Sequence, residues 1–285
     1  MGKTKPAIAG KKTFSPFWIA AITFAILWLV IAGGPFVFQI LATFKTQGEF
    51  ITSNLFDLPK QFNFDNYIGV LRGGFYRFFF NSTLVLTVSL VLLLFISAFA
   101  AYPLSRMKFR LNRPIYGAIV AAMSIPIHIT LIPLFSMSIR TGLYDKAYVL
   151  IGPNVAFNLP MSIFILTAFM QNISREMEEA AEIDGCGKFS TFFKIIFPLS
   201  KSGLATLGIY NGVMIWNEFT FAMILTQSVP ARTLPLAIWQ YQGQYGMNTP
   251  MIMALLALSS LPVILLYIFG QDKLVKGMMA GAVKG

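Results

Sequence analysis

Residues 84–95 read Leu84-Val-Leu-Thr-Val-Ser-Leu-Val-Leu-Leu-Leu-Phe95, and this run decides the class of fold. It lies inside a longer stretch, from Phe78 to Ser105, that contains no charged residue. Such a stretch is long enough to cross the roughly 30 Å hydrocarbon core of a bilayer as a helix. A membrane β-strand would need apolar and polar residues to alternate over about ten positions, and this run does not alternate. The sequence therefore predicts membrane helices and excludes a barrel.

Five further stretches are almost free of charge, and only one of them contains an acid, Glu218. Together with the first run they predict six membrane-spanning helices, at residues 17–42, 81–103, 115–138, 148–170, 203–226 and 251–270. The open alternative is five spans behind a cleaved leader. Against it, the first stretch is longer than the apolar region of a leader, and no small-residue cleavage site precedes a soluble domain.

The composition agrees with a membrane protein that crosses the bilayer several times. Of the 285 residues, 56% are hydrophobic and only 12% are charged, about half the usual share of charged residues. So few charges cannot cover the surface of a soluble domain, and a disordered chain, a coiled coil and a collagen are excluded as well. The single cysteine, Cys186, permits no internal disulfide and no cysteine-based metal cluster.

Lysine and arginine are distributed unevenly between the two sides of the predicted bundle. Of the 22, 15 lie before the first span, in the second and fourth loops, and after the last span. The positive-inside rule then places both termini in the cytoplasm. The net charge of +11 is thus explained by topology and does not indicate nucleic-acid binding.

The fourth loop differs from all the others, because it contains five of the eleven acids. Ser174 is a suitable cap for a first helix, and Gly185 is a suitable stop. Helical spacing puts Met177, Ala180, Ala181 and Asp184 on one face. A second helix is expected over 188–196, ended by Pro198. The acids argue against a loop lying on anionic lipid headgroups, and the small-residue face favours docking to another protein.

The same loop resembles the "EAA" loop of ABC-importer permease subunits. It reads Glu179-Ala180-Ala181, three residues, Gly185, nine residues, Ile195, one residue, then Phe197-Pro198, and it departs from the family pattern only by Phe197 for Leu. The resemblance implies a coupling helix pair seated in a cleft of an ATPase subunit. Glu179 would face a basic group there, and Gly185 would turn the chain. The implied coupling residues are Glu179, Ala180, Ala181, Asp184, Gly185, Ile195 and Pro198.

Three other segments are similar to carbohydrate-uptake permeases of the maltose-importer type: Trp216-Asn217-Glu218-Phe219, Arg232-Thr-Leu-Pro-Leu236 and Gly281-Ala-Val-Lys-Gly285. Within that type the chain resembles the smaller, six-span subunit. The resemblance implies four kinds of partner besides the lipid bilayer: a homologous second permease, two ABC ATPase subunits, an extracellular solute-binding protein and the sugar itself.

Glu218 is the one acid inside a predicted span, and ionisable groups there usually face a cavity or a partner. Trp216, Asn217 and Glu218 are therefore candidates for the sugar path or its gate. A structural hydrogen bond to a neighbouring helix is an equally open explanation for Glu218. The lone histidine, His128, is expected to be hydrogen-bonded between helices.

The segment Gln240-Tyr-Gln-Gly-Gln-Tyr-Gly246 is rich in amides and aromatic rings, which stack on and hydrogen-bond sugars. By resemblance it would probe the cleft of the binding protein and help to release the sugar. The candidate residues are Gln240, Tyr241, Gln242, Gln244 and Tyr245. The alternative is a polar interfacial loop whose tyrosines belong to the aromatic belt.

No phosphate-binding Gly-x4-Gly-Lys-Ser/Thr motif, catalytic triad or metal-ligand cluster occurs, so we expect no enzyme activity, cofactor or metal. The expected fold is an all-α polytopic membrane helical bundle: a cytoplasmic N-terminus (1–16), a six-helix permease domain (17–270) with the coupling loop (174–198), and a cytoplasmic tail (271–285). The expected function is that of a permease subunit of an ATP-driven sugar importer, with an oligosaccharide as the expected sugar, in a bacterial or archaeal plasma membrane; the subunit would form half of the translocation path. The alternatives are a glycerol-phosphate or polyol importer of the same build and an ion-coupled secondary transporter.

Overall fold

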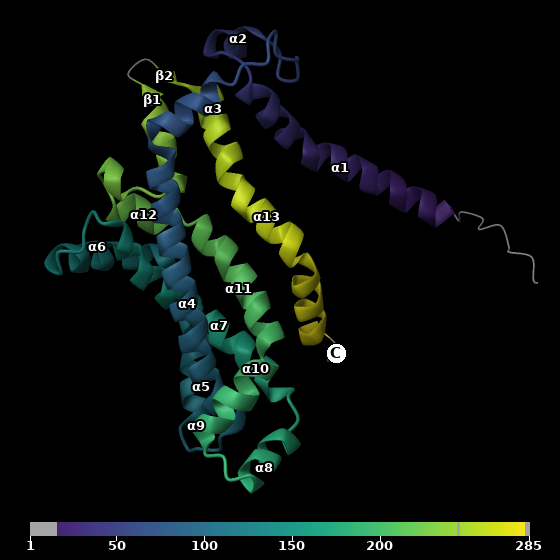
Figure 1. Cartoon of the computed structure of the whole chain (residues 1–285), viewed down its shortest axis with the longest axis vertical. Coiled ribbons are helices and arrows are strands. Elements are labelled where there is room, and N and C mark those ends of the chain that lie inside the picture. The colour runs from purple at the N-terminus through teal and green to yellow at the C-terminus, as the bar shows by residue number, and fades with distance from the viewer. Residues whose placement is uncertain (1–15, 244–245, 283–285) are drawn as a thin grey trace, which may run out of the picture.

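The computed structural model describes residues 16–243 and 246–282, and its architecture is helical (Figure 1). Four long helical segments dominate it. They are α1 (Pro16–Thr43), α4 (Tyr76–Arg106), α7 (Ile151–Gln171) and α13 (Thr249–Ala282). α4 continues the helical course of α3 (Asp65–Val70) through a π-helical turn, Leu71–Phe75, and α7 follows a 3-10 turn, Ala147–Leu150. The all-α membrane fold expected from the sequence is confirmed.

These four segments are long and apolar enough to cross a membrane, and two bent helix pairs within the described residues raise the number to as many as six. The first pair is α5 (Asn112–Ala122) followed by residues 127–140, which end in α6 (Leu131–Arg140). The second pair is residues 188–199 followed by α11 (Lys201–Trp216). The number of spans in the bilayer thus depends on whether each bent pair crosses it, and six spans remain a prediction.

The third predicted span, 115–138, is not a single straight helix. α5 and the 127–140 segment meet at 93°. Pro126 occupies the corner in an extended conformation, with ψ 131°. Proline lacks the N–H that would continue a helix, and its ring obstructs the preceding turn. His128 lies exposed just after this corner, so the hydrogen bond expected for it between helices is not formed within the described part of this chain.

The fifth predicted span, 203–226, is also interrupted. α11 ends at Trp216, and a separate short helix, α12 (Thr220–Leu225), begins after the break. Two side chains take the place of backbone bonds at this break. The Asn217 side chain donates to Val213 O at 2.9 Å, and the Glu218 carboxylate accepts the N–H groups of Phe221 and Ala222. Such side-chain bonds satisfy the groups that a broken helix leaves unpaired.

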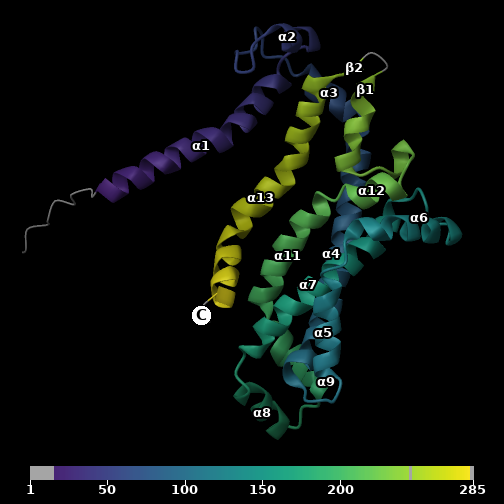
Figure 2. The same cartoon turned by 180° about the vertical axis from the view of Figure 1, so that it is seen from behind.

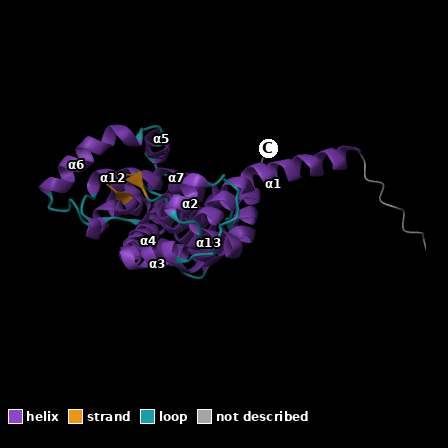
Figure 3. Cartoon of the chain, turned by 90° about the horizontal axis from the view of Figure 1, so that it is seen from above, coloured by secondary structure: helices purple, strands orange, loops and turns teal. Residues whose placement is uncertain are grey.

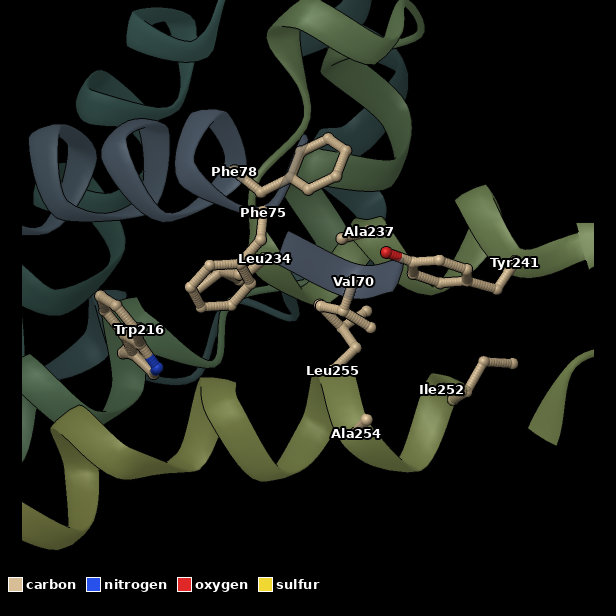
Figure 4. Close-up of a cluster of buried hydrophobic side chains, with 10 residues drawn as sticks. All are labelled: Val70, Phe75, Phe78, Trp216, Leu234, Ala237, Tyr241, Ile252, Ala254 and Leu255. Carbon is tan, nitrogen blue, oxygen red and sulfur yellow. The ribbon is translucent and has the colours of Figure 1, made fainter. Parts of the chain in front are cut away.

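Packing concentrates along α4, whose most extensive contacts are with α7 and which also contacts α11. Three clusters of buried apolar side chains follow the bundle from one end to the other. The first joins α3, α4, α13 and the 3-10 segment Leu234–Tyr241 (Figure 4). The second joins α4 to α12, and the third joins α4 to the segment after Gly187. A displacement of α4 would therefore alter side-chain packing at both ends of the molecule.

Two parts of the chain lie away from this bundle. α1 meets α13 only near its carboxyl end and then diverges from the rest, as the front, back and top views agree (Figures 1, 2 and 3). α5 and α6 lie on the opposite side (Figure 3). The large apolar side chains of α1 are widely exposed, which suits contact with lipid or with another membrane subunit.

The end of the bundle that carries α2 (Gln47–Thr52) also holds a short hairpin, β1 (Gln242–Gly243) paired antiparallel with β2 (Gly246–Met247). The opposite end holds α8 (Glu176–Ile183) and α9 (Lys188–Thr191) (Figure 1). α9 continues through a π-helical turn, Phe192–Ile196, into α10 (Phe197–Leu199). The two candidate loops of the sequence thus lie at opposite ends of the molecule.

Candidate functional site

The turn after α8 is a Schellman motif centred on Gly185. The N–H of Cys186 donates to Ala181 O at 2.8 Å, and the N–H of Gly185 donates to Glu182 O at 3.1 Å. Gly185 has φ +78°, a conformation that costs glycine little and other residues more. At the start of the helix, Ser174 Oγ accepts the N–H of Glu176 at 3.3 Å. The predicted stop at Gly185 is confirmed, whereas the N-cap position is occupied by Arg175 without a side-chain cap bond, so the prediction that Ser174 caps this helix is wrong; Ser174 forms a turn just before it.

The side chains of α8 point in two directions. Ala181 is 4% exposed and packs against the body of the protein, whereas Glu179, Ala180 and Asp184 are exposed. Met177, Ala180, Ala181 and Asp184 share a helical face by spacing, but Ala181, at the edge of that face, is covered by the protein itself, so the face that a partner could contact is smaller than predicted. The outward surface also includes Ile183, which is 86% exposed.

An ion pair fastens α8 to the end of α4. Arg106 Nε lies 3.4 Å from Glu178 Oε1, and the arginine side chain is only 3% exposed. A second nitrogen of the same guanidinium, Nη2, donates to Ile173 O at 2.6 Å. Because the pair is shielded from water, its attraction is stronger than that of a surface pair, and losing one partner is costly.

The helix after Gly187 is fastened to α4 by aromatic rings. Phe192 is buried, and its ring centroid lies 4.8 Å from that of Phe99 and 5.2 Å from that of Tyr102. Tyr102 also donates to Lys188 O at 3.4 Å. Phe189 of the same helix is 75% exposed. α8 and α9 therefore form a unit held by α4 that presents acidic and aromatic groups outward.

The second helix of the loop does not end where the sequence predicts. It runs past Pro198 to Leu199, and the 68° bend into α11 follows at Ser200. Just before the proline the helix widens, because Phe197 N–H donates to Phe192 O, five residues back. A π-helical turn of this kind lets a helix accommodate a proline that has no N–H to give. Ile195 and Pro198 are both half-buried.

A cavity of about 420 Å³ opens beside the break between α11 and α12. Of the three residues predicted for a sugar path or gate, Trp216 and Asn217 line it and Glu218 does not. The indole Nε1 of Trp216 donates to Ser259 O of α13 at 3.0 Å, so this hydrogen bond joins the end of α11 to α13 at the cavity wall. Glu218 instead lines a separate small cavity and caps α12, which agrees with the structural explanation of this acid.

Three polar lining residues of this cavity, Gln39, Ser259 and Ser260, are not predicted from the sequence. Their only sequence signal is that each is a polar residue within a charge-poor stretch, which is too common to be diagnostic. Phe219, which adds an aromatic ring, belongs to the segment that resembles carbohydrate-uptake permeases. No lysine, arginine or acid lines the cavity among the described residues.

The candidate loop 240–246 is only partly available to a partner. Gln240 is exposed, but Tyr241 is 9% exposed and its hydroxyl points into the first apolar cluster, near Val70 and Ala237 (Figure 4). Tyr241 is therefore a packing residue in this conformation. The backbone of Gln242 lies in the hairpin, while Gln244 and Tyr245 lie outside the described residues.

No group of three histidine, cysteine, aspartate or glutamate side chains within residues 16–243 and 246–271 could hold a metal ion. The buried ionisable groups described above serve an ion pair and a helix cap. The arrangement combines a cavity beside a helix break with a pair of short helices that α4 holds at one end of the bundle.

Comparison with known proteins agrees with this arrangement. Residues 93–279 match the family described as "Binding-protein-dependent transport system inner membrane component". A putative ABC transporter permease protein, ORF2, of Caldicellulosiruptor sp. (strain Rt8B.4) is 52% identical over 92% of this chain and 95% of its own length. The diacetylchitobiose uptake system permease protein NgcG of Streptomyces coelicolor is 31% identical over 93% of this chain and 89% of its own length.

A solved structure shares the fold. It is a chain of a bacterial ABC transporter involved in the import of the acidic polysaccharide alginate, with a TM-score of 0.80. The match covers 94% of this chain and 99% of that chain, at 21% sequence identity.

Proposed function

Because the chain belongs to the family of binding-protein-dependent transport system inner membrane components, we propose that it is the smaller, six-span permease subunit of an ATP-driven sugar importer. The observation that carries this proposal is the unit formed by α8 and α9. It presents Glu179, Ala180 and Asp184 outward while Arg106, Phe99 and Tyr102 hold it to α4.

The α8–α9 unit would seat in a cleft of an ATPase subunit. Glu179 would pair with a cation there, and the turn at Gly185 would set the angle between the two helices. Movement of the ATPase would then be transmitted through the Arg106–Glu178 pair to α4, and along α4 to the rest of the bundle. ATP hydrolysis would belong to the partner subunits.

The cavity beside Trp216 and Asn217 would form part of the sugar path. Its lining combines apolar rings with the polar side chains of Gln39, Ser259 and Ser260, which suits molecules with apolar faces and many hydroxyls. A glycerol-phosphate path would instead require cationic groups, and the described lining contains none. Since Glu218 is engaged by backbone N–H groups, it offers little support for an ion-coupled transporter. A neutral oligosaccharide is the substrate that fits best.

The remaining partners follow from the same family. A homologous permease would complete the path, and a solute-binding protein would deliver the sugar near Gln240 at the end opposite α8. The chain would reside in a bacterial or archaeal plasma membrane with both termini in the cytoplasm, and its Lys/Arg distribution supports this orientation.

The variant Glu179→Lys tests the proposal. It replaces an exposed anion by a cation and touches no span, so the chain should still insert. We expect uptake of a labelled oligosaccharide and co-purification of the ATPase subunits to fall at least tenfold, with Glu179→Gln intermediate. An attraction desolvated at an interface is worth several kcal/mol, and its reversal is worth more. Normal uptake and normal retention of the ATPase in the lysine variant would contradict the proposed coupling surface.

A further inference from the structure

A second, much smaller cavity shares Trp216 with the proposed path. It is lined by α4, the Ala147–Leu150 turn, α7, the α11–α12 break and the segment that precedes Leu234. It offers about 10 Å³ to the centre of a water-sized sphere, which is the room that one water molecule needs. Its polar lining consists of Ser82, Asn154, Glu218 and Thr233.

Two of these side chains have hydrogen-bond donors to offer. Thr233 is 5% exposed, and its Oγ1 has no hydrogen-bond partner among the described residues. Ser82 is 4% exposed, and its Oγ accepts the N–H of Leu234 at 2.9 Å, which leaves the hydroxyl proton free to be donated. A buried hydroxyl that donates no hydrogen bond lowers the stability of the fold, so the hydroxyl protons of Ser82 and Thr233 both need an acceptor.

The other two side chains have acceptors to offer. Asn154 donates its Nδ2 to Leu150 O at 2.9 Å, and the amide oxygen retains its lone pairs. The carboxylate of Glu218 accepts Phe221 N–H at 2.6 Å and Ala222 N–H at 3.2 Å. A carboxylate can accept about four hydrogen bonds, so two of its acceptor positions remain.

We propose that this cavity binds one structural water molecule. Two hydroxyl donors, from Ser82 and Thr233, and two acceptors, from Asn154 and Glu218, match the two lone pairs and two protons of a single water. A dehydrated cation would need about six oxygen ligands, and it would gain nothing from the two hydroxyl protons.

The water joins four segments that are far apart in the sequence. It links α4 through Ser82, α7 through Asn154, the break between helices through Glu218, and the Arg232–Leu234 segment through Thr233. Trp216 lines both this cavity and the 420 Å³ cavity. The bound water thus holds in place the broken helix that forms the wall of the larger cavity.

The experiment compares three forms of the full-length chain, purified with the subunits that co-purify with it. They are the wild type, Thr233→Val and Thr233→Ser. Val keeps the shape of threonine and removes the hydroxyl, whereas Ser keeps the hydroxyl. We expect a density map that resolves ordered waters to show one peak between Ser82, Asn154, Glu218 and Thr233 in the wild type and in Thr233→Ser. We expect Thr233→Val to lose this peak and to lower the melting temperature by about 2–4 °C.

Thr206→Val is the matched control, because Thr206 Oγ1 bonds only Ser202 O within its own helix and lies outside this cavity. It should leave the peak unchanged and should not reproduce the shift seen in Thr233→Val. Absence of a peak in the wild type would overturn the proposal. So would a peak with the short contacts of a metal ion that disappears when sodium and potassium are removed, and so would a Thr233→Val protein that keeps both the peak and the melting temperature.

Discussion

At the scale of single residues, backbone geometry is the most specific constraint on the α8–α9 unit. Gly185 has φ +78°, and an added Cβ at this position would meet no atom within 4 Å. A substitution there would therefore strain the backbone without any steric clash. The left-handed conformation costs a non-glycine residue roughly 1–2 kcal/mol.

The variant Gly185→Ala should open the turn between α8 and α9 and reduce sugar uptake several-fold, while the amount of chain in the membrane stays normal. Gly187→Ala is the matched control, because Gly187 also has open space around it but has φ −72°, which alanine adopts freely. Uptake assays and quantified membrane fractions measure both. Equal uptake by the two variants would show that the angle of this turn does not matter.

Residue-scale prediction succeeded where the chemistry is local. The turn at Gly185 depends on neighbours within a few positions, and it is present, while the expected cap at Ser174 is one residue away from the observed N-cap, Arg175. Residue-scale prediction failed where tertiary packing determines whether a side chain is exposed. Tyr241 is typical of a sugar-contacting loop by composition, yet it is buried against α3 and the 234–241 segment (Figure 4). No local pattern distinguishes a tyrosine that faces solvent from one that fills a core.

At the scale of elements, α4 is the part that couples the two ends of the molecule. Its carboxyl end holds α8 through Arg106 and Glu178, and its amino-terminal half packs in the first apolar cluster. The sequence predicts α4 as a span, but it does not predict this pair, because 72 positions separate the two residues and neither belongs to a recognisable motif.

The variant Arg106→Met leaves Glu178 shielded from water without its partner, which should loosen α8 and uncouple ATP hydrolysis from uptake. We expect uptake to fall at least tenfold while the purified complex still hydrolyses ATP, since breaking one side of a buried pair costs about 3–5 kcal/mol. The second variant, Arg106→Met with Glu178→Leu, removes both charges and should recover part of the uptake. If the single and double variants lose uptake equally, the charge pair is not the coupling contact.

A second link between elements lies at Asp145, in the loop between α6 and α7. Its Oδ1 accepts the N–H groups of Gln227 and Ser228 at 2.7 and 2.8 Å, and its own N–H donates to Leu225 O. Burial alone would raise the pKa of Asp145. The hydrogen bonds from Gln227 and Ser228, with the charge of Arg232, outweigh burial and hold the pKa below its usual value of 3.8.

Because the pKa is lower in the folded protein, ionised Asp145 stabilises the fold above its ordinary pKa, and this contribution is lost as the pH falls through the lowered value. Asp145→Asn tolerates the same backbone conformation, φ 59°, but carries no charge. We expect it to melt about 2–4 °C below the wild type at pH 7, and the gap to narrow as the pH falls below about 4. A gap that stays constant across that range would show that the charge contributes nothing.

Helix breaks explain most of the difference between the predicted and observed elements. The charge-poor stretches 115–138 and 203–226 predict continuous spans because hydropathy does not report the direction of a helix axis. Pro126 bends the first, and the bonds made by Asn217 and Glu218 stop the second. The proline signal was present in the sequence. The role of Glu218 depends on its carboxylate accepting the backbone N–H groups of Phe221 and Ala222, which the amino-acid composition does not reveal.

At the scale of the whole molecule, the two candidate loops lie at opposite ends, as a protein that works across a membrane requires (Figures 1 and 2). The α8–α9 unit belongs to the end that the basic residues assign to the cytoplasm, and the hairpin β1–β2 belongs to the other end. Hydropathy and charge were sufficient for this arrangement, because a bilayer imposes it on any chain of this composition.

Fusions to a phosphatase that is active only outside the cell test this orientation. The Lys/Arg distribution, 15 on one side and 7 on the other, places residues after Gly270 in the cytoplasm, so a fusion after Gly285 should be inactive. A fusion after Gly142, in the loop that holds Asp145, should be active and serves as the matched control.

The same pair of fusions shows whether the bent segment formed by α5 and residues 127–140 crosses the bilayer. If α5 with residues 127–140 crosses the bilayer once despite its 93° corner, the Gly142 fusion lies outside. If the corner returns the chain to its starting side, the Gly142 fusion is inactive and the number of spans falls by one. The number of spans would then be odd, which two cytoplasmic termini do not allow unless the second bent pair also fails to cross.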